Sequence, residues 1–181
     1  MKNEVRLIGG LYKRRKLPVA DRPGLRPTPD RVRETLFNWL GQDLDGWRVL
    51  DAFAGSGALG LEAASRGAAE VLLLEQDPQL VQSLRGTVER LQAKAVRVER
   101  TEAQRWMAAC AAQRFELVLL DPPFDAGLGA ASAALAARLV APGGYVYVEG
   151  PKPLSEAPAG LSPYRSLRAG AVHAQLFQAG D

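Results

Sequence analysis

The sequence of 181 residues contains very few of the side chains that many active sites use, with one cysteine and one histidine. The single Cys110 excludes an internal disulfide bond and a zinc cluster, and the alanine-rich stretch around it predicts a thiol in a helical core. His173 lies in an alternating, strand-like stretch, for which a structural or surface role is the simpler interpretation. Catalysis by a Cys-His or Ser-His pair therefore has almost no residues to use.

Long hydrophobic runs are also missing from the sequence. No apolar stretch reaches the length needed to cross a membrane, and Met1 to Glu4 lacks the apolar start of a signal peptide. We therefore expect a cytoplasmic protein. A hydrophobic fraction of 47% with 24% charged residues is typical of a globular chain, and the length predicts one domain with a small appendage.

Positive charge is concentrated near the N-terminus. Residues 1–40 contain ten Lys or Arg and four Asp or Glu, a net charge of +6. Residues 41–181 contain thirteen basic and sixteen acidic residues, a net charge of −3. This asymmetry indicates a polyanionic partner, and a solvated basic terminus is the alternative.

The basic segment predicts a hairpin followed by a loop. Residues 4–17 alternate in polarity and break at Gly9-Gly10, which indicates two short strands. The run Lys13 to Lys16 would lie on the second strand or at its end. Prolines and a glycine mark residues 19–28 as a loop.

A helix is expected after this loop. Thr28 predicts the N-cap and Pro29 the first helical position, and the helix should end near Leu40. Apolar residues at helical spacing form one face that packs on a core, namely Val32, Leu36, Phe37 and Leu40. Arg31 and Arg33 lie mostly off that face.

Strands and helices alternate from residue 48 onwards. Strands are predicted at 48–53, 70–75, 95–100, 115–120 and 145–149, and helices at 58–66, 78–91, 103–112 and 127–140. This alternation indicates an α/β fold with a parallel, doubly wound sheet. The remaining predictions are a turn at 142–144, a loop at 151–163 and a closing hairpin at 164–169 and 172–178.

A glycine turn follows the first of these strands. Gly55, Gly57 and Gly60 match a dinucleotide fingerprint, so a nicotinamide cofactor is one interpretation. Asp51 at the strand end would repel a pyrophosphate, but it suits the amino group or sulfonium of S-adenosylmethionine. Glu75, which ends the next strand, could accept hydrogen bonds from ribose hydroxyls of either cofactor. The position of Asp51 favours the methyl donor.

A second motif, Asp121-Pro122-Pro123-Phe124, follows the strand at 115–120. That strand normally adjoins the first one, so Asp121 and Asp51 should face one crevice. A carboxylate and a proline-flanked carbonyl can accept N–H bonds from an exocyclic amine and hold its nitrogen in line with a methyl group. Pro122 and Pro123 would stiffen the loop, and Phe124 offers a face on which an extruded base can stack.

These motifs resemble those of a known family. The Asp-Pro-Pro-Phe motif after a Gly-x-Gly turn is similar to the amino-methyltransferases that use S-adenosylmethionine. The bacterial small-subunit ribosomal RNA guanine-N2 methyltransferases (RsmD) show a wider resemblance, over essentially the whole chain. It is carried by Arg6-Leu-Ile-Gly-Gly, Arg15-Lys16-Leu-Pro, Leu25-Arg-Pro-Thr-Pro-Asp-Arg-Val-Arg-Glu-Thr-Leu-Phe-Asn-Trp-Leu40 and Asp51-Ala-Phe-Ala-Gly-Ser-Gly-Ala-Leu-Gly-Leu-Glu-Ala.

The resemblance implies a fold and a division of the chain. The fold is a Rossmann-like, seven-stranded methyltransferase sheet, mostly parallel with an antiparallel last strand, plus an N-terminal hairpin and helix. Residues 1–41 would dock RNA and residues 42–181 would form the methyltransferase domain. The substrate would be 16S ribosomal RNA or an assembling small subunit, and the protein a monomer without a metal.

The resemblance also implies roles for individual residues. Cofactor binding is expected from Asp51, Phe53, Ala54, Gly55, Ser56, Gly57, Glu75, Gln76, Asp77, Glu102 and Ala103. Glu102 departs from the Asp or Asn typical of such a position. Asp121, Pro122, Pro123 and Phe124 would act on the guanine. RNA contacts are expected from Arg6, Lys13, Arg14, Arg15, Lys16, Arg26, Thr28, Arg31 and Arg33.

Three alternatives stay open at this point. A DNA adenine-N6 methyltransferase is disfavoured because no target-recognition domain is present. A small-molecule amine methyltransferase is disfavoured by the basic N-terminal segment. A non-catalytic RNA-binding assembly protein with the same fold is disfavoured by the intact Asp51, Glu75 and Asp121 motifs.

Overall fold

A computed structural model describes residues 3–20, 28–123 and 127–181. Two predicted site residues, Arg26 and Phe124, lie outside these ranges. The elements are β1 (Asn3–Arg6), β2 (Lys16–Val19), α1 (Asp30–Trp39), β3 (Arg48–Asp51), α2 (Ala58–Ser65), β4 (Glu70–Glu75), α3 (Pro78–Leu91), β5 (Val96–Arg100), α4 (Ala103–Ala109), β6 (Phe115–Leu120), α5 (Gly129–Leu139), β7 (Val140–Gly150), β8 (Leu161–Ala169) and β9 (Val172–Ala179).

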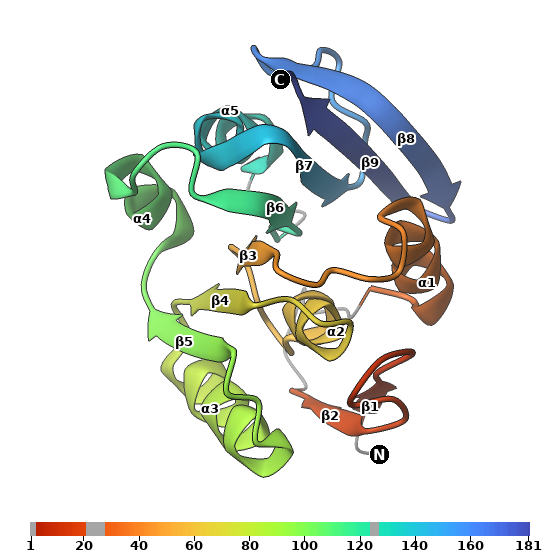
Figure 1. Cartoon of the computed structure of the whole chain (residues 1–181), viewed down its shortest axis with the longest axis vertical. Helices are drawn as coiled ribbons and strands as arrows, with labels where there is room; N and C mark the ends of the chain where they lie inside the picture. The colour runs from red at the N-terminus through yellow and green to blue at the C-terminus, as the bar shows by residue number, and fades with distance from the viewer. Residues whose placement is uncertain (1–2, 21–27, 124–126) are drawn as a thin grey trace.

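The central feature is a seven-stranded sheet in the order β5-β4-β3-β6-β7-β9-β8 (Figure 1). Its first five strands are parallel, and β9 pairs antiparallel with both β7 and β8. The expected α/β class, the Rossmann-like sheet and its antiparallel last strand are confirmed. The closing hairpin is also confirmed, although both of its strands are longer than expected.

Helices cover both faces of this sheet, so its parallel strands are apolar on both sides. Side chains such as Val49 and Leu73 pack with α1, α2 and α3, whereas Leu50 and Leu72 pack with α4 and α5. Figure 1 shows α4 and α5 on one side of the sheet and α2 on the other. The alternation means that the parity of a residue number within a strand decides which face its side chain occupies.

The N-terminal residues form a separate two-stranded sheet, β1-β2, with antiparallel pairing from Asn3 opposite Val19 to Arg6 opposite Lys16. The hairpin is confirmed, but only Lys16 of the basic run lies on a strand, because β2 begins there. Side chains of this segment share one core with the main sheet, including Leu7, Leu17 and Phe37. The division of the chain at residue 41 stays a prediction.

Two predicted boundaries are wrong for local reasons. Residues 142–144 are part of β7 instead of a turn, because pairing with β6 already starts at Val140 and passes through an irregularity in register. The predicted loop at 151–163 is too long, because β8 already begins at Leu161 and Pro163 lies within it. That position is tolerable because β8 is an edge strand, where a residue without an N–H donor costs less.

Cys110 does not lie in a helical core as predicted. Helix α4 ends at Ala109, and Cys110 is its partly buried C-cap with extended backbone angles.

Within residues 3–20, 28–123 and 127–181, no helix is long and apolar enough to cross a membrane.

Candidate active site

The carboxyl ends of the parallel strands open into a cavity of about 750 Å³. Thirteen of the residues predicted from the sequence line it: Thr28, Asp51, Phe53, Ala54, Gly55, Ser56, Glu75, Gln76, Glu102, Ala103, Asp121, Pro122 and Pro123. This is the edge at which ligands bind in open α/β sheets. The structure thus brings the two motifs, which are 70 residues apart, into one site.

The turn between β3 and α2 needs its glycines for two different reasons. Gly55 and Gly57 have φ angles of 56° and 85°, a region that glycine enters without strain. At Gly60 the reason is space, because a Cβ atom would lie 2.3 Å from Leu73 Cδ2 and 2.9 Å from Asp51 Oδ2. The third glycine therefore lets α2 approach the strands closely and leaves its own N–H directed at Asp51.

Asp51 is buried, with 1% of its surface exposed. Its Oδ2 atom accepts a hydrogen bond of 2.9 Å from Gly60 N, whereas Oδ1 is buried and has no hydrogen-bond partner among the residues that the structure describes. Burial raises the pKa of Asp51 to about 7, the Gly60 hydrogen bond opposes this, and the charge of Glu75 adds to it. A cationic group that bonded to Oδ1 would satisfy that atom, as the amino group of S-adenosylmethionine would. The site therefore fits the expected methyl donor.

Glu75 links the two loops that border this part of the cavity. Its Oε1 accepts from Gly55 N at 3.1 Å and its Oε2 from Asp77 N at 2.9 Å. Each carboxylate oxygen can accept a second hydrogen bond, so the side chain can still bind a hydroxyl group. The ribose role of Glu75 and the adenosine role of Gln76 stay predictions.

Two other predicted cofactor residues serve as helix caps. Asp77 caps α3 by accepting from Gln79 N at 2.8 Å, and it is not among the residues that line the cavity. Glu102 caps α4, with its two oxygens accepting from Gln104 N at 3.1 Å and Arg105 N at 2.7 Å. The departure to Glu at position 102 thus keeps a helix cap, while Ala103 lines the cavity beside it.

Asp121 lies half-buried at the wall of the cavity, where β6 ends. Burial is the largest cause that raises the pKa of Asp121 well above its ordinary value. The charge of Glu149 and a hydrogen bond between the two side chains raise it further. Pro122 and Pro123 continue along the same wall. The structure thus places Asp121, Pro122 and Pro123 together at the cavity. Amine binding by this wall stays a prediction, and Phe124 lies outside the described ranges.

Thr28 does not cap α1 as predicted. Pro29 occupies the N-cap position, and no side chain provides a cap hydrogen bond. The buried Thr28 hydroxyl instead lies 3.0 Å from Glu149 Oε2 and 3.3 Å from Asp121 Oδ2. The hydroxyl therefore contacts the acids at the cavity and not the end of α1, and Thr28 lines the cavity.

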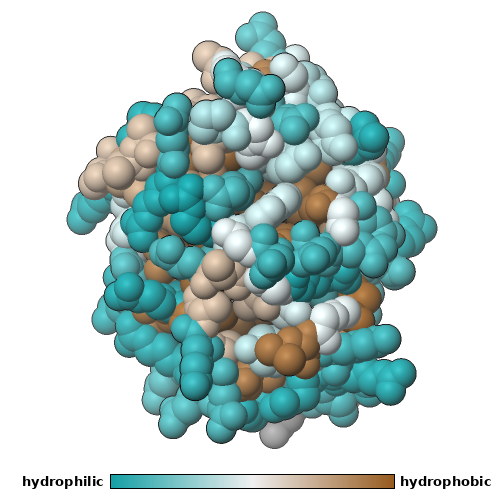
Figure 2. Space-filling view, in the orientation of Figure 1, coloured by the Kyte–Doolittle hydropathy of each residue, from teal (hydrophilic) through white to brown (hydrophobic). Residues whose placement is uncertain are grey.

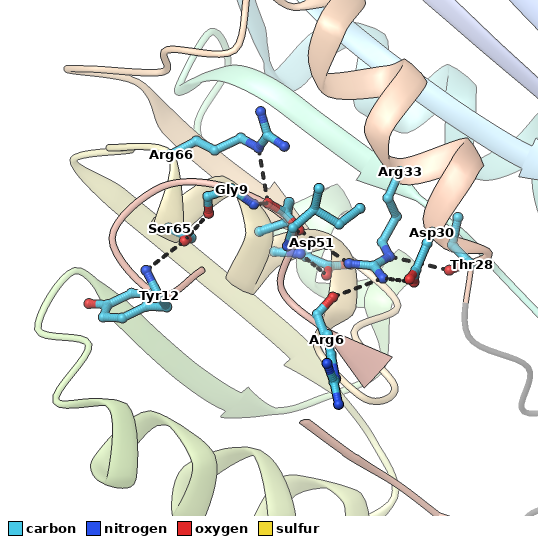
Figure 3. A network of polar contacts seen from close by, with 12 residues as sticks. Arg6, Gly9, Tyr12, Thr28, Asp30, Arg33, Asp51, Ser65 and Arg66 are labelled. Carbon is cyan, nitrogen blue, oxygen red and sulfur yellow. Dashed lines mark hydrogen bonds and ion pairs between the residues drawn. The ribbon is translucent and has the colours of Figure 1, made fainter. Parts of the chain in front are cut away.

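Arg33 does not fit its predicted role in RNA binding, because its side chain is fully buried. Figure 3 shows its guanidinium within a polar network in which it donates to the carbonyl oxygens of Thr28 at 3.3 Å and Arg6 at 3.1 Å. It also donates to Glu62 Oε1 at 3.2 Å and to Asp30. All of these partners belong to the protein, so no phosphate can reach this guanidinium.

Glu62 on α2 is the centre of this network and is also fully buried. Its carboxylate accepts from the backbone N–H groups of Ile8 at 2.9 Å and Gly9 at 3.0 Å, and from Arg66 Nε at 3.0 Å. The N-terminal segment is therefore fastened to the helix that follows the glycine turn.

The remaining predicted RNA contacts lie on the surface wherever the structure describes them. Exposed residues of this set are Arg6, Lys13, Arg14, Arg15, Lys16 and Arg31. Figure 2 shows the face of the molecule that is turned to the viewer in Figure 1. Hydrophilic residues cover most of that face, and hydrophobic residues lie in smaller separate areas. Such a surface suits a polar or charged partner, and the phosphate contacts stay predictions.

Several residues that line the cavity were not predicted from the sequence. Glu149 is 3% exposed and lies near the end of β7 as Asp121 follows β6, so an acid at the end of an apolar strand was the available signal. Ala171 and Val172, at the β8–β9 turn, carry no such signal. They reach the cavity only because β9 runs antiparallel between β7 and β8. His173, to which no role was assigned, lies opposite Gly150.

The chain is similar to known proteins over most of its length. Residues 5–178 match the protein family described as Conserved hypothetical protein 95. The ribosomal RNA small subunit methyltransferase D of Escherichia coli (strain K12) is 43% identical over 179 residues, which cover 97% of this chain and 90% of that protein. The methyltransferase D of Haemophilus influenzae is 40% identical over 153 residues, 82% of this chain and 79% of that protein.

Solved structures show the same relationship. A protein from Escherichia coli that is assigned as a methyltransferase has a TM-score of 0.88 and 42% identity, with coverage of 98% of this chain and 99% of that one. A hypothetical protein of Thermus thermophilus has a TM-score of 0.81 and 35% identity, with coverage of 95% and 98%. The chain therefore belongs to the ribosomal RNA small subunit methyltransferase D family.

Proposed function

We propose that this protein transfers a methyl group from S-adenosylmethionine to the exocyclic N2 amine of a guanine in 16S ribosomal RNA. The observation that carries the proposal is the meeting of Asp51 and Asp121 in one cavity, in a chain that is 43% identical to a ribosomal RNA small subunit methyltransferase. A cytoplasmic location and a small-subunit particle as substrate belong to the same proposal.

The methyl donor supplies an electrophilic carbon attached to a sulfonium. Oδ1 of Asp51, which has no partner among the described residues, would hold the donor's amino group, and Glu75 would accept from its ribose hydroxyls. The glycine turn leaves room for the donor because Gly55 carries no side chain. These residues bind and orient the donor.

The wall formed by Asp121 and Pro122 would act on the acceptor. Asp121 and the Pro122 carbonyl would accept the two N–H bonds of the amine, which holds its nitrogen in line for attack and favours the charge that develops on it. The amine nitrogen of guanine is a weak nucleophile because its lone pair is delocalised into the ring. Positioning and electrostatic stabilisation are therefore the main contributions expected from this site.

Asp121→Ala tests this assignment. Loss of one transition-state contact should slow methylation by about two to three orders of magnitude while S-adenosylmethionine binding, measured by calorimetry, stays within about twofold. Asp45→Asn, at an exposed acid outside the cavity, is the control and should change neither quantity. Full activity of Asp121→Ala would rule out the amine-positioning role.

Mass spectrometry of ribosomal RNA from a deletion strain tests the substrate. Loss of one N2-methylguanosine from 16S RNA, restored by the wild-type gene, is the expected result. Loss of a methyl group from DNA or from a small amine would support the other amino-methyltransferases instead, and no change in any methylated species would favour a non-catalytic assembly protein.

A further inference from the structure

Three acids end neighbouring strands on the same face of the sheet. Asp51 ends β3, Asp121 follows β6 and Glu149 lies near the end of β7, and these strands are adjacent in the order β3-β6-β7. The register pairs Asp51 with Leu119 and Leu120 with Val148, which places Asp121 beside Glu149. Since side chains alternate between faces, all three carboxyl groups point to the side covered by α1 and α2.

The Thr28 hydroxyl bridges two of these acids. It lies 3.0 Å from Glu149 Oε2 and 3.3 Å from Asp121 Oδ2. A hydroxyl has one proton to donate but can also accept, so one carboxylate receives that proton and the other carboxyl group donates to the hydroxyl oxygen. The bridge is therefore complete when one of the two acids carries a proton.

Of the two acids, Glu149 has the closer contacts with hydroxyl groups. Its Oε1 accepts from the Tyr147 hydroxyl at 2.5 Å, and its Oε2 is the nearer acceptor for Thr28. Two hydroxyl donors stabilise a carboxylate, whereas Asp121 has the longer contact. Burial, and after it the charge of Glu149, raises the pKa of Asp121 well above the ordinary value, so both favour a proton on Asp121.

We propose that Glu149 and Thr28 form a proton relay with Asp121, so that Asp121 can take a proton from the amine while it already carries one. The relay rests on the proposed function. As the nitrogen lone pair forms the N–C bond, the C–S electron pair stays on sulfur and an N–H proton moves to Asp121 Oδ1. The proton on Oδ2 passes to Thr28, and the Thr28 proton passes to Glu149 Oε2. No electron is gained or lost, and the pair ends with one extra proton.

Within the described residues 3–20, 28–123 and 127–181, a small set of polar groups faces this relay. Asp51 faces it from β3, and its charge also raises the pKa of Asp121. From β7 the Tyr147 hydroxyl contacts Glu149, and from β9 His173 lies opposite Gly150. Arg33 touches the Thr28 carbonyl, but Glu62 and Asp30 balance its charge. These described groups therefore favour a proton that is shared between Asp121 and Glu149.

The test is the pH dependence of single-turnover methylation, with small subunits from a deletion strain as substrate. The wild type should work with one proton on the pair. Glu149→Gln removes the final acceptor, so Asp121 must lose its own proton before it can accept another. The variant should therefore be slowed about 10- to 100-fold at low pH and recover as the pH rises, which moves the acidic limb of its profile upwards.

Thr28 provides a second, independent variant if Glu149→Gln does not fold. Thr28→Val removes the bridge and should show the same pH-dependent deficit, whereas Thr28→Ser keeps the hydroxyl and should restore the limb. S-adenosylmethionine affinity should stay within about twofold in all three variants. Thr35→Val removes a hydroxyl from the solvent side of α1, where it bonds to the Arg31 carbonyl, and it controls for general effects of losing a threonine.

The outcomes separate the relay from the proposed function. A pH-independent deficit in Glu149→Gln, equal deficits in Thr28→Val and Thr28→Ser, or a loss of cofactor affinity would overturn the relay while wild-type methylation still supported the function. A wild type that binds S-adenosylmethionine but never methylates small subunits would overturn the proposed function itself.

Discussion

Two groups of buried charges lie on the same side of the sheet and differ in their balance of charge. In the network around Glu62, each charge has a partner of opposite sign, since Arg33 and Arg66 contact the same carboxylate. At the cavity, Asp51 and Glu149 both raise the pKa of Asp121, because their charges have the same sign as its own. Within the described part of the chain, the Oδ1 atom of Asp51 has no hydrogen-bond partner.

The difference separates a structural use of buried charge from a functional one. A charge that is paired and hydrogen-bonded within the fold has no remaining capacity for a ligand, and its loss affects stability. Acids that are left unbalanced cost stability, and a cationic ligand or a transferred proton relieves that cost. The raised pKa values of Asp51 and Asp121 are the signature of the second kind.

The largest expected effect comes from breaking the balanced network. Arg33→Met leaves the buried carboxylate of Glu62 with one fewer cation, and such a loss typically costs about 3–5 kcal/mol of unfolding free energy. Urea denaturation would measure it. Arg31→Met, at the exposed arginine two positions earlier on α1, is the matched control and should change stability by less than about 0.5 kcal/mol. Equal effects of the two changes would contradict the structural role of Arg33.

The unbalanced group should make the ligand-free protein less stable as the pH rises. Because the pKa of Asp51 is raised from 3.8 to about 7, the folded state binds more protons than the unfolded state between these values. Stability should therefore fall from pH 4 to pH 7, by at most about 4 kcal/mol from this residue at 1.36 kcal/mol per pH unit. Thermal unfolding of the wild type and of Asp51→Asn would show it, and the slope should be shallower in the variant. An identical slope would contradict the assignment.

Asp51 should also control the affinity for the methyl donor. This affinity should rise with pH, whereas the stability of the ligand-free protein should fall. An ionised Asp51 bonds to the cationic amino group, so affinity should increase as the pH rises towards and through about 7. Asp51→Asn should weaken binding by about 1.5–3 kcal/mol in calorimetry, the size of a charged hydrogen bond. Asp45→Asn serves as the control. Preferential binding of NAD by the wild type would overturn the cofactor assignment.

The smallest effect is expected at the surface, where charges are solvated. Arg14→Gln with Arg15→Gln should reduce the salt dependence of RNA binding, with a log–log slope smaller by roughly 0.7 per lost phosphate contact in a single strand. Glutamine suits position 14 because Arg14 already has a φ of 71°, so the backbone strain stays similar. Arg97→Gln with Arg165→Gln, at exposed arginines of β5 and β8, is the control. An unchanged slope would mean that the N-terminal run is only a solvated face.

The sequence was sufficient for features that depend on nearby residues. Strand–helix alternation and the glycine turn predicted the parallel sheet, and the general position of ligands in such sheets brought Asp51 and Asp121 together. Both follow from periodicity and from a topology that few α/β chains violate. Thr28 shows the limit of local rules. It is a residue type that favours the N-cap, but its hydroxyl contacts acids that lie 93 and 121 positions away in the sequence.

Only the tertiary structure decided which charges are buried and with whom. Arg33 looks like a solvent-facing residue on the α1 pattern, but Glu62 on α2 lies across from it and makes burial favourable. Glu149 joins the site because β7 lies next to β6 in a register that no local pattern encodes. The sequence by itself determined the helices and strands and the edge of the sheet at which the site residues lie, since these follow from short-range sterics and hydrophobic periodicity. The pairing of charges needed the folded chain, because electrostatic energy depends on distances and burial that exist only after distant segments have packed.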